Sequence, residues 1–421
     1  MAIPEVWTIS ITGTWVEDDT CYLELNGKQL VLTVGTAVTI ADIGAALVAM
    51  INGNAAVGTE SRSALGSSVG EFARVTASYV AADANLVITG QSDGRPIGTL
   101  SVDSTGSAAG TIAIDGGTFS TAGTGPNDWD NADNWSADTA PVNTDSVVCD
   151  HQASSAIKYN LDQTSLTLAS LIITNGFRHS IGLSEINRDS ANVPYDENLT
   201  TFLSLAAATV MNIDGSGGGS IKIDCAATDS TTTVTGSGSS VDANMPAIQL
   251  NLNNAGADLN VLGGDVGVCL TSGTAGNLAT LTCGGSQQSR LTIGDTVTLA
   301  AGTVSAGKVI INGSITTLTV EGGECEQRGA GTIGTLNLNR GTFTDISIGT
   351  ITALYQNGGV YDRSKDNRGK TISAYVVYAR STIKDPFGTI TASAGFDFYP
   401  RLQDLTIDFP TRKKYTLAAV S

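Results

Sequence analysis

A six-residue phrase recurs along the second half of the chain at an almost constant interval. Each copy opens with glycine and most close on leucine, with Thr, Ile or Val between them. The clearest copies open at Gly276, Gly294, Gly313, Gly331 and Gly349, and looser copies open at Gly219, Gly238, Gly256, Gly369 and Gly388. Regular repeats of this length are typical of a solenoid in which each coil stacks on the one before. We therefore expect a mainly β protein with a parallel β-helix of about 18–20 residues per rung over residues 146–395.

Positions that share a phase of the repeat are expected to stack from rung to rung. Right-handed coiling is the general preference of parallel crossovers, and we expect it here. Ile315 lies three residues before Leu318, so a bend or bulge is expected between these residues. The expected columns are Val320, Leu338 and Gln356, and Cys325, Phe343 and Tyr361.

One corner of the rung carries its own repeat of glycine and polar residues. A tight turn there requires positive φ, which we expect at Gly323, Gly341 and Gly359. The residues two positions earlier are Glu321, Asn339 and Asn357. Stacked asparagines form hydrogen-bonded ladders at such corners, and the glutamate is expected to break this one.

Residues 1–122 lack the repeat and predict a small α+β module. Asn26-Gly27 lies between two alternating apolar runs, which is the strongest short signal for a β-hairpin. A helix is expected over residues 41–51, because Thr39 and Asp42 form a capping-box pattern and the apolar residues share one face. Further strands are expected at residues 72–79, 86–89, 98–102 and 111–114.

The 421 residues carry a net charge of −18, which argues against binding to nucleic acid or an anionic membrane, because such binding requires clustered Lys and Arg. No run of apolar residues is long enough to span a membrane. Residues 1–8 show neither the basic nor the apolar region of a secretory signal. The six cysteines lack CxxC spacing, so we expect free thiols and no metal cluster or cofactor.

The order of phrases in the N-terminal module resembles one found in bacteriophage virion proteins. The matching segments are residues 9–15 (Ile-Ser-Ile-Thr-Gly-Thr-Trp), 19–20 (Asp-Thr), 25–27 (Leu-Asn-Gly), 33–37 (Thr-Val-Gly-Thr-Ala) and 40–47 (Ile-Ala-Asp-Ile-Gly-Ala-Ala-Leu). The resemblance implies a module that docks on a phage particle, with no catalytic residues to carry over. It also implies a homotrimer made in the host cytoplasm, exposed on the virion as a decoration, spike or tail-fibre protein, with capsid or tail proteins as partners.

Residues 123–145 are rich in Asn, Asp and Trp. They are similar to the segment that precedes β-solenoids in adhesins and phage fibres. Trp129 and Trp135 are large enough to cover the open apolar end of the first coil, and a solenoid needs such a cap to avoid end-to-end association. We expect this segment to be a linker and N-terminal cap.

Three glutamates on one rung are candidates for catalysis. Glycoside cleavage requires two carboxyl groups roughly 5–9.5 Å apart. Glu321, Glu324 and Glu326 share a rung, and Asp345 and Asp362 could extend the acidic patch on later rungs. The simpler interpretation is a solvated face of an acidic protein, because no aromatic groove lines the patch. A tailspike that degrades or binds host-surface glycans is therefore the first alternative function, and a bacterial adhesin is the second.

Asp128, Asp130 and Asp133 are candidate Ca²⁺ ligands, because carboxylates are the oxygen donors that this ion prefers. Their spacing departs from an EF-hand loop, since Asp133 stands where glycine is required and no glutamate closes the loop. Asx turns are the simpler interpretation. The two histidines, His151 and His179, have no partner at ligand spacing.

Aromatic residues gather in the last part of the chain, residues 396–421. The candidates for an oligomer contact are Phe396, Phe398, Tyr399, Phe409 and Tyr415. Aromatic residues are enriched in subunit interfaces, and they also suit a cap over the last coil. The two roles are compatible if the cap is where chains meet.

Overall fold

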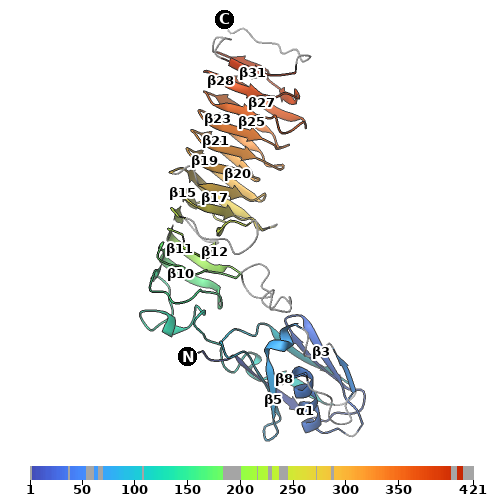
Figure 1. Cartoon of the computed structure of the whole chain (residues 1–421). Helices are drawn as coiled ribbons and strands as arrows, with labels where there is room; N and C mark the ends of the chain where they lie inside the picture. Colours follow the sequence, from blue (N-terminus) through green and yellow to red (C-terminus); the bar gives the residue numbers. More distant parts are fainter. Residues whose placement is uncertain are drawn as a thin grey trace. The chain divides into compact units, whose positions relative to one another are not determined.

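The chain divides into two compact units (Figure 1). The first comprises residues 1–140, 155–161 and 183–201, and the second comprises residues 141–154, 162–182 and 202–421. No helix in the part of the chain described is long and apolar enough to cross a membrane. The computed structural model describes residues 2–36, 38–53, 61–64, 70–106, 109–183, 201–215, 217–225, 230–236, 245–271, 273–285, 289–399 and 405–410.

The N-terminal unit contains two antiparallel four-stranded sheets and one α-helix. The first sheet has the order β5 (Thr76–Val80), β6 (Asn85–Thr89), β1 (Val6–Thr12) and β8 (Thr111–Ile114). The second has the order β4 (Ser61–Ala64), β3 (Lys28–Thr33), β2 (Thr20–Leu25) and β7 (Leu100–Thr105). The remaining elements are α1 (Ile40–Ile51) and the 3₁₀ helices η1 (Gly70–Arg74), η2 (Asp115–Gly117) and η3 (Ala132–Asn134).

The local signals of this unit are confirmed with one exception. The Asn26-Gly27 turn has φ of 51° and 77° and joins β2 to β3, as a type I′ hairpin requires. Thr39 caps α1, and both hydrogen bonds of the capping box with Asp42 are present. The strand expected over residues 72–79 was wrong in its first half, because a 3₁₀ helix occupies residues 70–74 there.

The second unit is a parallel β-solenoid of about 11 turns from residue 146 to residue 408, which confirms the predicted fold. Two ladders run along it, and every strand pairing in them is parallel. The first ladder contains β9 (Ser146–Cys149), β10 (Asp162–Ile173), β11 (Leu203–Ile213), β13 (Thr231–Val234), β15 (Asp258–Val261), β17 (Gly276–Cys283), β19 (Val297–Val304), β21 (Ser314–Val320), β23 (Ile333–Leu338), β25 (Ile351–Gln356), β27 (Lys370–Val377), β29 (Ile390–Ala392) and β30 (Phe396–Phe398). The second contains β12 (Ile221–Cys225), β14 (Ile248–Leu252), β16 (Asp265–Val268), β18 (Arg290–Ile293), β20 (Lys308–Ile311), β22 (Glu324–Gln327), β24 (Thr342–Asp345), β26 (Val360–Asp362), β28 (Ser381–Lys384) and β31 (Leu405–Asp408).

Inward residues form the columns that the repeat predicts. The register stacks Val320, Leu338 and Gln356 in one buried column, and Cys325, Phe343 and Tyr361 in another. The strand β21 bends as expected, since Ile315 and Thr317 pair with β23 whereas Thr316 between them does not. All six cysteines are buried and free.

The corner of the rung also follows the prediction, apart from its glutamate. Gly323, Gly341 and Gly359 have φ of 67°, 72° and 67°. Asn357 donates a side-chain hydrogen bond to Asn339 (2.8 Å), and Asn339 donates one to Glu321 (2.7 Å). The expectation that the glutamate breaks the ladder was wrong, because its carboxylate accepts the last hydrogen bond and so ends the ladder.

Two details of the repeat differ from the pattern of glycines. Leu299 stacks on Leu278 and not on Leu281, because Leu281 faces Gly302 in the paired strand. The corner loops therefore vary in length even where the glycine-to-leucine phrase recurs at an even interval.

The ladders also continue through β30 and β31, so solenoid strands extend beyond residue 395 to residue 408.

Candidate functional site

One inward column of the solenoid changes from apolar to charged as it approaches the C-terminal rungs. Ile293 pairs with Ile311, and Ile311 pairs with Gln327. Gln327 in turn pairs with Asp345, and Arg363 follows β26 at the corresponding place one rung later. These side chains are fully buried, so the interior of the last rungs contains ions instead of hydrocarbon. An ion in such a place is stable only when paired and hydrogen-bonded.

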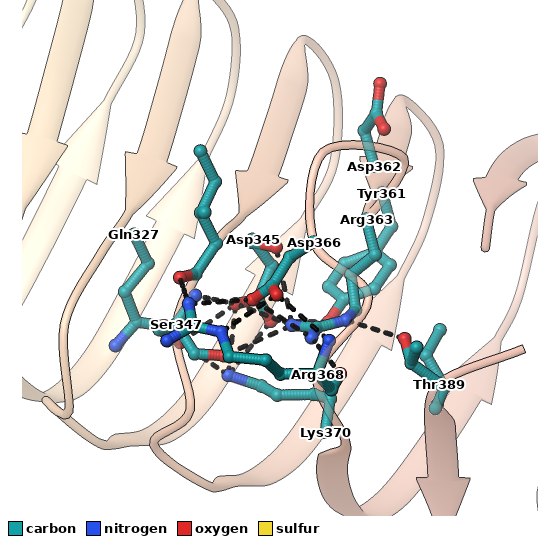
Figure 2. A network of polar contacts seen from close by, with 12 residues as sticks. Gln327, Asp345, Ser347, Tyr361, Asp362, Arg363, Asp366, Arg368, Lys370 and Thr389 are labelled. Carbon is teal, nitrogen blue, oxygen red and sulfur yellow. Dashed lines mark hydrogen bonds and ion pairs between the residues drawn. The ribbon is translucent and has the colours of Figure 1, made fainter. Parts of the chain in front are cut away.

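Asp345 lies at the centre of this cluster (Figure 2). Its Oδ1 accepts hydrogen bonds from the backbone N–H of Ser347 (3.0 Å) and from the Ser347 hydroxyl (2.8 Å). Its Oδ2 accepts a hydrogen bond from the Tyr361 hydroxyl (2.6 Å) and lies 2.9 Å from Lys370 Nζ. Both carboxylate oxygens are therefore satisfied by donors from three different positions of the chain.

Arg363 neutralises the same carboxylate from the other side. Its Nη1 lies 3.3 Å from Asp345 Oδ1, and its Nη2 lies 3.3 Å from Asp366 Oδ2. Its N–H groups donate hydrogen bonds to the Thr389 hydroxyl and to the carbonyl oxygens of Asp345, Ser347 and Arg368. The planar guanidinium thus joins three consecutive corners of the solenoid, which a lysine could not do with a single nitrogen.

The corner loop at residues 364–369 completes the cluster. The step from Ile351 to Ile372 takes 372 − 351 = 21 residues, against 351 − 333 = 18 for the preceding step. This longer corner supplies Asp366 and Arg368, and Arg368 binds both oxygens of Asp366 and the carbonyl oxygen of Ile346. We call Asp345, Ser347, Tyr361, Arg363, Asp366 and Lys370 the buried ion network.

Burial and pairing shift the pKa values in this network in different directions. Burial lowers the pKa of Lys370, against the opposing attraction of Asp345. Burial raises the pKa of Tyr361 well above its ordinary value, and the neighbouring Asp345 carboxylate adds to this. The hydrogen bond from Arg368 lowers the pKa of Asp366. The lysine is thus easier to deprotonate than usual, and the tyrosine remains a proton donor.

Comparisons with protein-family models, with curated proteins and with solved structures returned no match. The chemistry of the site therefore rests on its own geometry. The sequence did not lead us to this network, and it placed Asp345 wrongly in a surface acidic patch. The available signal was the register itself, because Asp345 and Arg363 stand 18 and 36 residues after the inward Gln327.

The three glutamates proposed for catalysis lie on one rung, each beside a partner. Glu321 is exposed and accepts the hydrogen bond from Asn339. Glu324 is exposed and lies 3.9 Å from Lys308, while Glu326 is buried and pairs with Arg328. Asp362, at the end of β26, pairs with Lys384 (3.5 Å). Whether any of them is catalytic stays a prediction.

The three aspartates proposed as Ca²⁺ ligands point to different places. Asp128 is buried, accepts two hydrogen bonds from Asn160 and forms an Asx turn with the backbone N–H of Asp130. Asp130 and Asp133 are exposed. The backbone N–H of Asp133 donates a hydrogen bond to the side-chain oxygen of Asn131, which forms a second Asx turn. Among the described residues, no group of three His, Cys, Asp or Glu side chains could hold a metal ion.

The tryptophans of the expected cap pack on each other within the N-terminal unit. Trp129 is fully buried, and its ring lies edge-on to Trp135 with centroids 4.9 Å apart. Trp135 donates its indole N–H to the carbonyl oxygen of Trp129 (2.8 Å). Their role as a cap over the first coil stays a prediction.

The C-terminal aromatic residues divide between interior and surface. Phe396 is buried next to Tyr375, with ring centroids 5.1 Å apart, and contacts both Phe398 and Phe409. Tyr399 is 54% exposed and stacks on an exposed tyrosine of the preceding rung, Tyr378. Tyr415 lies outside the described residues. An aromatic interior thus closes the last described rungs, and Tyr399 is the most accessible of the candidates for a subunit contact that the structure describes.

Proposed function

We propose that the protein is a structural component of a bacteriophage particle, a surface decoration, spike or fibre in which the solenoid serves as a rigid rod. The observation that carries this proposal is the pair of parallel ladders running through about 11 turns. At about 4.8 Å per turn, such a rod is on the order of 50 Å long. Stiffness along the rod follows because each rung is hydrogen-bonded to its neighbours.

The N-terminal unit would dock the rod on the particle. The phage-like phrases of residues 9–47 all lie in this unit, and the unit has its own hydrophobic core. An attachment domain requires a fold of its own, because it must keep its structure when mechanical force acts on the solenoid. Other capsid or tail proteins would be its partners.

Contact between copies would use a face of the solenoid without charge. One outward column contains Thr298, Ser314, Thr332, Thr350, Thr371 and Thr391, whose strands pair in register. A chain with net charge −18 repels its own copies overall, so an uncharged column offers little repulsion between copies. A homotrimer joined through this face fits a spike axis.

Two measurements test the proposal. Purified particles from the source culture should contain the chain by mass spectrometry, and electron microscopy with an antibody against the N-terminal unit should place that unit next to the particle surface. In solution, light scattering should give a trimer that Thr350→Lys dissociates and Thr342→Lys, on the second ladder, does not. Absence from the particles, or release of oligosaccharide from host capsule by the pure protein, would overturn the structural assignment.

A further inference from the structure

Lys370 and Asp345 are held in the arrangement from which an amide bond forms. Lys370 Nζ lies 3.1 Å from Asp345 Oδ1 and 2.9 Å from Oδ2, so the nitrogen faces the carboxyl group between its two oxygens. Both side chains are fully buried. They belong to corners of consecutive rungs, at the end of β24 and the start of β27 (Figure 2).

We propose that Lys370 and Asp345 become joined by a covalent amide between Nζ and Cγ in the folded protein. In the neutral forms, the Nζ–Cγ bond is made and the bond from Cγ to the Oδ2 hydroxyl is broken. The hydroxyl leaves with one proton from the amine, so an amine and a carboxylic acid give an amide and one water molecule. No oxidant, reductant or other reactant is needed.

Hydrogen-bond donors lie next to each carboxyl oxygen of Asp345 and would assist this reaction. Oδ1, on which negative charge develops during attack, is held by the N–H and hydroxyl of Ser347 and lies 3.3 Å from Arg363 Nη1. Donors fixed around a developing oxyanion lower the barrier because they need no reorganisation. Oδ2, the oxygen that leaves, accepts the hydrogen bond from Tyr361.

A path for the proton is also present. Lys370 Nζ lies 2.9 Å from Asp345 Oδ2 and donates another N–H to the Ser347 hydroxyl (2.7 Å). The ammonium proton can therefore pass directly to Oδ2 and produce the neutral amine and the acid that carries its proton on the leaving oxygen. Burial favours this transfer, since it lowers the pKa of Lys370 and disfavours separated charges.

The product is also favoured by its surroundings. The amide replaces one buried ion pair with a neutral group, and Arg363 and Asp366 remain as a paired cation and anion. A site without solvent exposure also protects the amide from hydrolysis. The bond would join two consecutive turns of the solenoid covalently. Its formation needs no oxidising compartment, because no oxidant takes part in the reaction.

Intact mass spectrometry of the purified full chain tests the proposal. The expected mass is lower than that of the sequence by one water molecule. Trypsin should fail to cleave after Lys370 and should give a branched peptide in which Gly341–Arg363 is joined to Gly369–Arg380. A folded wild-type chain of full sequence mass, cleaved normally after Lys370, would overturn the proposal.

Matched variants assign the roles. Lys370→Arg keeps the charge but should restore the full mass, whereas Lys365→Arg, at an exposed position of the same corner, should keep the loss of water. Tyr361→Phe should slow the loss of water after refolding at least about tenfold, as expected when one proton donor is removed. An unchanged rate in Tyr361→Phe would remove the tyrosine from the reaction.

Discussion

Gly349 lies directly over Gly331 in the next rung, and a Cβ atom on Gly349 would overlap the carbonyl oxygen of Gly331. The same holds for Gly331 over Gly313. The repeated glycines therefore mark places where two turns of backbone approach each other more closely than a side chain allows. Their φ values are not positive, so the requirement is one of space and not of backbone conformation.

Substitution of Gly349 by alanine should therefore push neighbouring rungs apart. We expect Gly349→Ala to lower the free energy of unfolding of the solenoid by about 2–3 kcal/mol, as overpacking in a closely packed interior does. Gly369→Ala is the matched control, because nothing lies within 4 Å of a Cβ atom there, and it should change stability by less than about 0.5 kcal/mol. Guanidinium unfolding followed by circular dichroism measures both, and equal effects would contradict the steric explanation.

The corner ladder predicts a pH-dependent variant. Asn339→Asp places a carboxylate against Glu321, where the amide now donates a hydrogen bond. We expect a loss of about 0.5–1 kcal/mol at pH 7, because a hydrogen bond is replaced by repulsion at an exposed site. The loss should shrink in acid, because neutral carboxyl groups do not repel each other. Asn337→Asp, whose partner is the Thr319 hydroxyl, adds the same charge without facing a carboxylate and should lack the pH dependence.

Arg363 should be the least replaceable side chain of the buried ion network. Arg363→Met removes the buried cation that pairs with Asp345 and Asp366, and the donor to the buried carbonyl oxygens of Asp345 and Ser347. Breaking a buried ion pair on one side costs about 3–5 kcal/mol, so the C-terminal rungs should unfold at markedly lower denaturant. Arg340→Met removes the same charge from an exposed corner and should cost less than about 0.5 kcal/mol. Faster amide hydrogen exchange in β24 to β28 would show that stability is lost in these rungs. Unchanged exchange there would refute the role of Arg363.

The sequence predicted the rod because its stacking is periodic. Val320, Leu338 and Gln356 occupy one column since equal steps in sequence give equal positions in space. The helix cap at Thr39 was predictable for a similar reason, because it depends on residues a few positions apart. Rung length was less predictable, since corner loops lengthen without changing the apolar pattern, as residues 364–369 show.

The buried ion network escaped prediction because charge usually indicates exposure. Asp345 looked like a surface residue, yet its phase in the repeat is that of buried Ile311 two rungs earlier. Its burial depends on Arg363 and Lys370, which come from later rungs and enter the same interior. Pairing of this kind depends on the three-dimensional register, which alternation within one strand does not reveal.

The N-terminal unit contains two buried carboxyl groups that should make its stability depend on pH. Burial raises the pKa values of Glu5 and Asp128 in the folded protein, above ordinary values of 4.5 and 3.8. Between the ordinary and the raised pKa, the folded state binds more protons than the unfolded state. The stability of this unit should therefore fall as pH rises from about 4 through the raised pKa values, and the penalty is complete above them.

Glu5→Gln isolates the contribution of one of these groups. The substitution removes the ionisable group but keeps the oxygen that accepts the hydrogen bond from Trp7 (2.5 Å). We expect it to raise the free energy of unfolding at pH 7, because it removes the cost of ionising a buried carboxyl group, and to leave it unchanged near pH 3.5. Glu17→Gln removes a carboxylate from an exposed position and should show no such difference. Tryptophan fluorescence reports this unit alone, because all four tryptophans of the chain lie between residues 7 and 135. A Glu5→Gln effect of equal size at both pH values would show that the buried carboxylate carries no ionisation penalty.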